Sequence, residues 1–309
     1  MFLSFIIGLF SFILIVLFVL FSGSCVPETR NAVMMFLNTV LPTMFPFYVL
    51  SSIIVSSGFL TRICSPLKSL TNRILKLPAS CIAAILLGWL CGFPIGAKIT
   101  CDLKERGDIT ADEAARLSSF TNSVGPIFMA SIVGGAYLGS IKIGLLLWIS
   151  VIVSSLFSGL LICRFRREPL HPAISCDSPV SETKIDIPAS ILSSMNTVLY
   201  VGAVIIFFSS VTSLLKRIPG LSDFTYGTMY SFLEITGGLN ILTGKFVSDH
   251  IRLNYLLVSA FSAWSGCSVH MQVCGILLSG KINLKYYFAG KLLQTLLAPA
   301  VLWFLLIFL

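Results

Sequence analysis

The sequence predicts an all-α, polytopic membrane protein with two inverted repeats, each containing a re-entrant hairpin and a broken helix. Three observations lead to this prediction: the composition, a series of long apolar runs, and shorter apolar pieces broken at matched positions. The chain has 309 residues, of which 56% are hydrophobic and 11% charged, with a mean hydropathy of +0.95. Soluble domains carry about 25% charged residues, so we expect this chain to lie in a lipid bilayer.

Apolar runs of about 20 residues are long enough to cross a bilayer. The sequence contains such runs at 3–22, 31–59, 143–163, 191–214 and 288–309. Pro42 and Pro46 interrupt the second run, so we expect that helix to be kinked. The first run follows no Lys or Arg and is too long for the apolar core of a cleaved signal peptide, which favours a retained transmembrane helix.

Between these runs lie shorter apolar pieces that end in breaks rich in Gly, Pro and polar residues. They are 79–91 before "GFPIG", 117–138 with "TNSVGP", 226–243 with "EITGG" and 253–279 with "WSGCS". Irregular backbone at membrane depth is tolerated only where it is buried in protein or lines a cavity. We therefore predict two hairpins with tips at "GFPIG" and at 236–238, and two broken helices. Thr110 and Glu113 form a capping box that should open the first broken helix.

Matched landmarks indicate an internal duplication. "NTVL" occurs at 38–41 and again at 196–199, and "LSSF" at 117–120 matches "VSAF" at 258–261. Gly125 and Gly139 recur 141 residues later as Gly266 and Gly280, and Gly96 recurs after 142 residues as Gly238. The predicted organisation is therefore an N-terminal transmembrane helix at 1–24, repeat 1 at 31–163, a cytoplasmic linker at 164–190 and an inverted repeat 2 at 191–309.

The distribution of Lys and Arg predicts the orientation. With the N-terminus, the loops 60–78 and 164–190, the turn 104–116 and the turn that carries Lys281 and Lys285 in the cytoplasm, 13 basic residues lie inside and 6 outside. This asymmetry follows the positive-inside rule. The two hairpins then enter from opposite faces, which is the architecture of many secondary transporters.

The breaks predict a binding site near the middle of the bilayer. Helices should begin near Gly96, Pro126, Gly238 and Ser268, and their free N–H groups favour an anion. The candidate substrate-binding residues lie at or beside the breaks: Gly92, Pro94, Gly96, Lys98, Asn122, Ser123, Gly125, Glu234, Thr236, Gly237, Gly238, Ser265, Ser268, His270 and Gln272. The polar members of this set could equally satisfy carbonyls freed by the breaks.

Three ionisable residues have two interpretations each. A lysine in mid-membrane is costly, so Lys98 either binds an acidic ligand or partner, or pairs with Asp102 one turn away. Glu234 is either part of a structural ion pair or a partner of Lys98 that an acidic ligand displaces. His270 either faces the ligand or is a packed, hydrogen-bonded core residue.

The sequence lacks the signatures of several other classes. There is no GxxxxGK[ST], HExxH or GxSxG motif, which argues against an ATP-driven motor and against an enzyme. No basic stripe with interleaved aromatic residues indicates nucleic-acid binding. We predict no cofactor and no metal site.

Three separated stretches resemble one family. "GFPIGAKITCDL", "DEAARLSSFTNSVGPIF" and "GCSVHMQV" are similar to segments of the YlbJ/SpoVV sporulation membrane proteins. These belong to the nucleoside-recognition (Gate) domain group, which is similar to concentrative nucleoside transporters, and the match spans about Val40 to Lys291. The resemblance implies a transporter of a small anionic or aromatic solute in sporulation, and specifically of dipicolinic acid across the outer forespore membrane.

Other functions remain open at this point. The chain could be a nucleoside-type solute transporter, which would use uncharged hydrogen-bonding groups more than Lys98, or a sporulation membrane scaffold that transports nothing. The expected partners are a small-molecule substrate and the lipid bilayer. A coupling ion, either a proton or sodium, and a homo-oligomer are left open. The expected location is the cell membrane or the outer forespore membrane.

Overall fold

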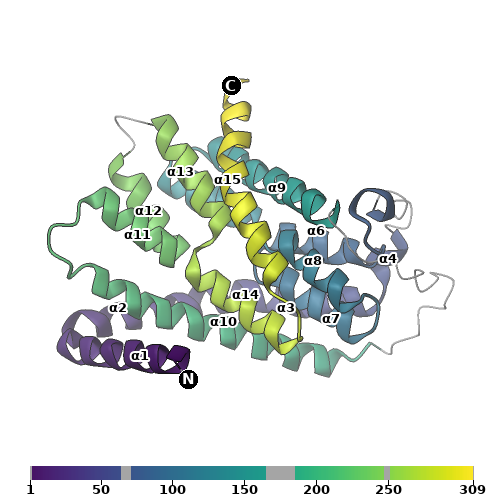
Figure 1. The fold of residues 1–309 in the computed structure, drawn as a ribbon, viewed down its shortest axis with the longest axis horizontal. Helices are drawn as coiled ribbons and strands as arrows, with labels where there is room; N and C mark the ends of the chain where they lie inside the picture. The colour runs from purple at the N-terminus through teal and green to yellow at the C-terminus, as the bar shows by residue number, and fades with distance from the viewer. Residues whose placement is uncertain (1, 64–70, 165–184, 247–250, 309) are drawn as a thin grey trace.

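The computed structural model describes residues 2–63, 71–164, 185–246 and 251–308, and these residues form helices and no strand (Figure 1). The N-terminal third contains α1 (Phe2–Leu20), α2 (Ser22–Met35), η1 (Phe36–Val40), α3 (Leu41–Ser56), α4 (Phe59–Ile63) and η3 (Thr71–Leu75). The middle contains α6 (Cys81–Cys91), α7 (Ile95–Glu105), α8 (Ala111–Thr121), η4 (Phe128–Tyr137) and α9 (Ile141–Arg164). The last part contains α10 (Ile187–Leu215), α11 (Asp223–Leu233), α12 (Ile235–Phe246), α13 (Ile251–Trp264), α14 (Gly266–Ser279) and α15 (Lys285–Ile307).

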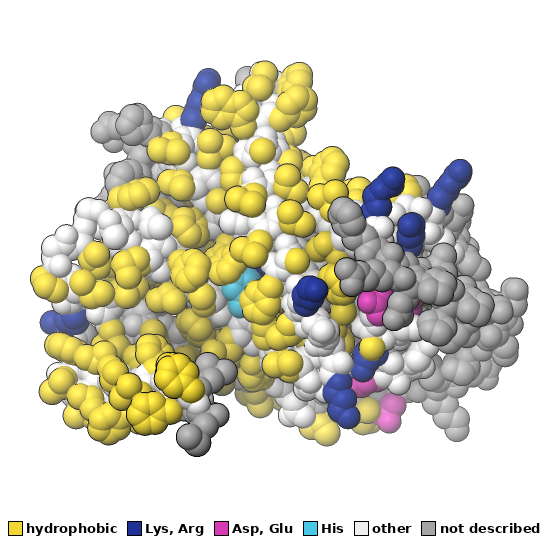
Figure 2. All heavy atoms as spheres, in the orientation of Figure 1, with side chains coloured by type: hydrophobic (Ala, Val, Ile, Leu, Met, Phe, Trp, Pro, Cys, Tyr) yellow, Lys and Arg dark blue, Asp and Glu magenta, His cyan; other side chains and the backbone are white. Residues whose placement is uncertain are grey.

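The described residues include four helices that are long and apolar enough to cross a membrane. They are the continuous helix Ser22–Ser56, Ile141–Arg164, Ile187–Leu215 and Lys285–Ile307. The apolar helix α1 has 19 residues and lies at the predicted position 3–22. Hydrophobic side chains cover most of the face in Figure 2, which is the surface expected of a protein in lipid. The predicted all-helical class with several candidate spans is thus confirmed.

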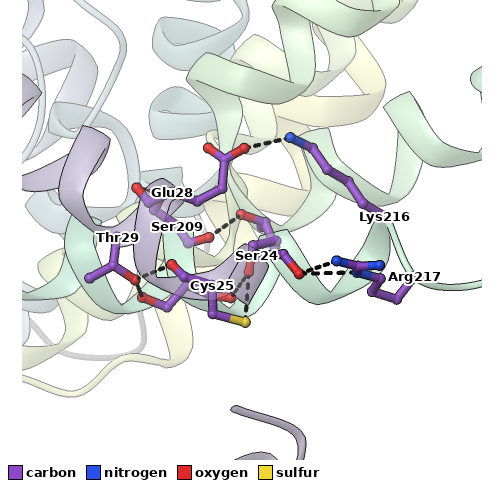
Figure 3. Close-up of polar contacts among 10 residues, drawn as sticks. Ser24, Cys25, Glu28, Thr29, Ser209, Lys216 and Arg217 are labelled. Carbon is purple, nitrogen blue, oxygen red and sulfur yellow. Dashed lines mark hydrogen bonds and ion pairs between the residues drawn. The ribbon is translucent and has the colours of Figure 1, made fainter. Parts of the chain in front are cut away.

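The second apolar helix begins nine residues earlier than predicted, at Ser22 instead of 31. The polar residues before the apolar run are therefore helical, and they are paired with α10 (Figure 3). Glu28 contacts Lys216 at 2.6 Å, and Arg217 donates to Ser24 at 3.0 Å. Two further hydroxyl contacts join the helices, Thr29 with Ser210 and Ser213 with Cys25. These polar contacts with α10 explain why the helix begins at Ser22, which the sequence of α2 alone does not predict.

The prolines of this helix are accommodated without ending it. Pro42 lies in the first turn of α3, directly after the five π-helical residues of η1, and Pro46 lies inside α3. A proline removes one backbone hydrogen bond and crowds the preceding turn. A π-helical turn is one way in which a continuous helix changes its hydrogen-bond register. The predicted interruption therefore takes the form of η1.

The first pair of short helices, α6 and α7, packs side by side and is followed by the first broken helix. The chain reverses at Gly92–Pro94, where Gly92 has φ of +83°. Helix α8 opens with the predicted capping box, in which Thr110 accepts from the Glu113 N–H and Glu113 accepts from the Thr110 N–H. It ends at Thr121, and helix resumes at Pro126 after four non-helical residues. The predicted breaks are present.

The second pair, α11 and α12, also packs side by side, but its turn is tighter than predicted. The helices are separated by Glu234 alone, so Thr236, Gly237 and Gly238 lie in the first turn of α12 and do not form the tip. The reason is the Glu234 side chain, which caps α12 in place of a glycine-rich loop. Helices α13 and α14 are separated at Ser265, which has φ of +76° and is followed by Gly266 with φ of +81°.

Helices α9 and α15 pack against each other and against both broken helices. The predicted ranges 143–163 and 288–309 correspond to Ile141–Arg164 and Lys285–Ile307. Small and polar residues allow close approach: Gly290 lies against Ser119, and Gln294 donates to the Ser119 carbonyl at 2.7 Å. Hydrogen bonds between helices of this kind add to van der Waals packing inside a bilayer.

Hydrogen bonds join turns that the charge count assigned to one side. Lys104 donates to the Gly280 carbonyl at 2.8 Å, and Arg106 donates to the Val55 carbonyl at 2.9 Å. Many of the charged side chains visible in Figure 2 gather at the end of the molecule over α4 and α7. The predicted loops 60–78 and 164–190 lie partly outside the described residues, because 64–70 and 165–184 are not described.

Candidate functional site

The four helix breaks meet in two pairs. A methyl group added at Gly92 would lie 3.0 Å from the Gly125 nitrogen, so the first reversal packs directly on the first broken helix. A methyl group added at Gly266 would lie 3.1 Å from the Ile235 nitrogen and 3.3 Å from the Glu234 Cα, so the second reversal packs on the second broken helix. The breaks therefore bring non-helical backbone segments next to one another in each pair.

A tryptophan side chain donates a hydrogen bond to a backbone carbonyl at each pair of breaks. Trp89 of α6 donates through Nε1 to the Phe120 carbonyl at 2.8 Å, and Trp264 of α13 donates to the Phe232 carbonyl at 3.2 Å. Both acceptors are carbonyls in the last turn of a helix that ends at a break, where the intrahelical donor is missing. The two tryptophans thus satisfy backbone groups that the breaks expose, in a role that the sequence pattern did not reveal.

The first broken helix presents a buried amide. Asn122 donates to the Ser118 carbonyl at 3.2 Å, while its Oδ1 atom is buried and has no hydrogen-bond partner in the described ranges. Ser123 is fully buried and donates to Ser155 at 3.2 Å. Gly96 lies beside this group, since a methyl group there would be 3.1 Å from the Asn122 Oδ1 atom. The predicted residues Gly92, Gly96, Asn122 and Gly125 are therefore brought together.

Lys98 forms the ion pair that one interpretation of the sequence anticipated. Its ammonium lies 3.0 Å from Asp102, and the two side chains are 5% and 25% exposed. Helix α7 runs beside α14 in the same direction, because Cys101 contacts the Ile276 carbonyl and Lys104 the Gly280 carbonyl. That register puts Lys98 level with Gln272 of α14. The Lys98 side chain of α7 is thereby placed beside the second broken helix.

Glu234 does not pair with Lys98 in this structure. Its two carboxylate oxygens accept the N–H groups of Thr236 at 2.9 Å and Gly237 at 2.7 Å. The carboxylate therefore caps the N-terminus of α12, where the helix dipole favours a negative charge. At the end of the preceding helix, α11, the same carboxylate would lie against the helix dipole. Because Glu234 occupies this N-terminus, α12 offers fewer free N–H groups to a ligand than predicted.

The second broken helix carries the other predicted residues. Ser265 is fully buried, and Gln272 donates to Ser268 at 3.4 Å. His270 is 6% exposed, and its Nδ1 atom lies 2.8 Å from the Tyr287 hydroxyl. Its Nε2 atom is buried with no partner among the described residues. His270 is thus packed and hydrogen-bonded on one side and unsatisfied on the other.

Lys291 is a buried charge that the sequence analysis did not select. It lies on α15, is 1% exposed, and donates to the Ala263 carbonyl at 3.2 Å and to Ser265 Oγ at 3.0 Å. The signal was available, because a lysine inside the apolar run 288–309 is expensive in a bilayer. It was missed because nothing in the local sequence links α15 to the break at Ser265.

The capping role of Glu234 gives a first testable prediction. Glu234→Gln should lower the free energy of unfolding by about 1–2 kcal/mol, because an amide offers one oxygen to two N–H donors and loses the favourable charge. Glu28→Gln is the matched control, since the Glu28–Lys216 pair is partly exposed and such pairs contribute about 0–1 kcal/mol. Thermal unfolding in detergent measures both, and equal midpoints for Glu234→Gln and wild type would contradict the capping role.

Comparisons with known proteins give one relative. The chain is 28% identical to the sporulation integral membrane protein YlbJ of Bacillus subtilis (strain 168) over 314 aligned positions, covering 89% of this chain and 76% of the relative. No family model matches the chain. No solved structure matches it either. The similarity extends over all four breaks, and together with the apolar helices it identifies an integral membrane protein with several spans.

Proposed function

As this chain is related to the YlbJ family of sporulation integral membrane proteins, we propose that it is a transporter of a small anionic or aromatic solute. The observation that carries the proposal is the pairing of four helix breaks inside a helical membrane protein, Gly92 with Gly125 and Glu234 with Gly266. Irregular backbone at membrane depth is tolerated where it is buried in protein or lines a cavity, and four breaks that meet in two pairs favour the second alternative. A scaffold without transport has no use for it.

The proposal includes two inverted repeats. The first pair of breaks recurs in the second after 142 and 141 residues, from Gly92 to Glu234 and from Gly125 to Gly266. The packing exchanges in the same way: α8 packs on α15 as α13 packs on α9, and η4 packs on α12 as α14 packs on α7. In Figure 1 the pair α6–α7 lies at one end and α11–α12 at the other. Re-entrant hairpins from opposite faces account for this arrangement.

An anionic substrate fits the charges of the breaks. Helices α7 and α14 begin at breaks without a side-chain cap, and uncapped helix N-termini favour anions. Lys98 lies beside α14 by the register described above. Dipicolinic acid, an aromatic dicarboxylate, is the substrate that the family resemblance implies. The proposed location is the outer forespore membrane. A proton or sodium gradient would drive the transport.

A nucleoside-type substrate is the second candidate. Uncharged hydrogen-bonding groups lie on both broken helices, and two of their atoms, Asn122 Oδ1 and His270 Nε2, are buried without partners among the described residues. A nucleoside base and ribose would satisfy such groups without a net charge. A nucleoside-type substrate does not need the ammonium of Lys98, whereas an anionic substrate does. This difference distinguishes the two candidate substrates in an experiment.

The test is uptake by the purified protein in liposomes. Dipicolinate, uridine and succinate are offered under an imposed proton or sodium gradient, and empty liposomes give the background. We expect uptake of dipicolinate above background and none of uridine. Uptake of uridine alone would favour the nucleoside-type function, and uptake of none of the three would leave the scaffold.

A further inference from the structure

Within the described residues, the ammonium group of Lys291 has no acidic partner. Both of its recorded acceptors, the Ala263 carbonyl and Ser265 Oγ, are neutral, and among the described residues the ion pairs are those of Lys98, Arg116 and Lys216. Removing one partner of a buried ion pair costs several kcal/mol, because the remaining charge is left uncompensated. A buried ammonium whose acceptors are all neutral is therefore stabilised when an anion binds beside it.

The surroundings of Lys291 also favour an anion. Ser265, which accepts from Lys291, is the residue before α14, and its side chain makes no capping hydrogen bond to that helix. The nearest break also contains Glu234, but its oxygens are engaged by the N–H groups of α12. A second observation is independent of the helix end: His270 is 6% exposed, and its Nε2 atom has no hydrogen-bond partner within the part of the chain that the structure describes.

Aromatic rings surround the same place. The His270 ring lies 4.3 Å from Trp264 and 5.6 Å from both Tyr287 and Phe288, measured between ring centroids. Tyr287 and Lys291 are one turn apart on α15, so they share one face of that helix. The Tyr287 hydroxyl holds His270 Nδ1 at 2.8 Å and leaves Nε2 as the unsatisfied atom. Edge and face contacts with such rings favour a planar aromatic ligand.

We propose that Lys291, the uncapped start of α14 and His270 Nε2 form a binding site for the carboxylate of an aromatic acid. In this structure the Lys291 ammonium rests on Ala263 and Ser265, and the carboxylate replaces these neutral contacts with a charge-assisted hydrogen bond. His270 contributes a hydrogen bond from Nε2, and the rings of Trp264 and Phe288 flank the aromatic part. The inference rests on the proposed function and assigns its anion to a residue of repeat 2.

The competing explanation is structural. Lys291 could serve only to satisfy the Ala263 carbonyl, which the break at Ser265 leaves without its helical donor. A structural role and a ligand role predict different results when the charge and the hydrogen bond are removed separately. Gln294 offers a matched control, because it lies three residues further along α15, is fully buried, and donates to neutral oxygens of Ser119 and Ser158.

The experiment measures binding by the purified full-length protein in lipid nanodiscs. The probes are benzoate, dipicolinate and uncharged benzamide, and the variants are Lys291→Met, Lys291→Arg and Gln294→Leu. We expect wild type to bind both acids more tightly than benzamide. Lys291→Met should weaken binding of the acids at least tenfold and leave benzamide unchanged, whereas Lys291→Arg should retain part of the affinity. Gln294→Leu should lower the unfolding temperature and change acid affinity less than threefold.

The possible outcomes test this inference separately from the proposed function. Wild-type affinity of Lys291→Met for benzoate and dipicolinate would show that Lys291 only satisfies the Ala263 carbonyl, even if dipicolinate uptake persists and the proposed function stands. Equal binding of benzoate and benzamide by wild type would also overturn it. Acid binding that depends on Lys291 without any uptake would support the site and overturn transport. If Lys291→Met does not fold, Lys291→Arg decides, because unchanged selectivity and affinity there exclude a close carboxylate contact.

Discussion

Gly96→Ala is expected to disrupt the packing of α7 against the first broken helix. A methyl group at Gly96 would collide with the Thr121 carbonyl, which is backbone and cannot rotate away. Gly88 of α6 lies against the same carbonyl, so Thr121 sits between the two arms of the helix pair. Overpacking of a tight core costs about 1–3 kcal/mol and sometimes more. We expect Gly96→Ala to lower the free energy of unfolding by about 3 kcal/mol, the upper end of this range, and to abolish uptake of dipicolinate.

The control for this substitution is Gly8→Ala in α1. Both glycines are inside helices, but no atom lies within 4 Å of a methyl group added at Gly8. The change should therefore leave the unfolding temperature unchanged or raise it slightly, since alanine favours helix over glycine. Unfolding of both variants is followed by size-exclusion chromatography after heating in detergent. A Gly96→Ala protein as stable as Gly8→Ala would show that α7 and α8 are further apart than described.

The largest electrostatic effect is expected at Lys98 and Asp102. Asp102→Ala leaves the Lys98 ammonium, 5% exposed, without its partner at 3.0 Å, and breaking a buried pair from one side costs about 3–5 kcal/mol. Lys98→Ala should cost less, because Asp102 is 25% exposed and keeps part of its hydration. The double variant should recover much of the stability lost by Asp102→Ala. A double-mutant cycle on unfolding temperature measures this coupling.

Uptake by the double variant separates the two interpretations of Lys98. A purely structural pair predicts that uptake returns together with stability. Substrate binding by Lys98 predicts a stable protein that transports little, because the ammonium is still missing. Uptake at the wild-type rate in the single variant Lys98→Ala, at equal protein level, would exclude Lys98 from the substrate site.

The positions of the helices follow from local sequence. Apolar length predicted the helices around 3–22, 143–163, 191–214 and 288–309, since each needs only its own composition to be stable in lipid. The capping box at Thr110 and Glu113 predicted where α8 begins, because both partners lie within one turn. The breaks at Gly92–Pro94 and Asn122–Gly125 were also predictable, because glycine and proline act on the backbone at their own positions.

The start of α2 and the role of Glu234 depended on more distant contacts. Residues 22–30 are polar and contain Pro27, and they become helical beside α10, some 180 residues away in sequence. Glu234 could be assigned to the end of α11 or to the start of α12, and only the tight turn decided for α12. In both cases the local sequence permits two conformations, and a contact made in the folded protein selects one.

The sequence alone determined that this is a helical membrane protein with four helix breaks, because hydrophobicity and backbone chemistry act locally. Tertiary structure alone decided which breaks meet and which charges are paired. Lys98 pairs with Asp102 one turn away, whereas the packing of α15 on α13 brings Lys291 to Ala263 and Ser265. The free energy of a buried charge depends on what surrounds it in space, and spacing along the chain does not encode those surroundings.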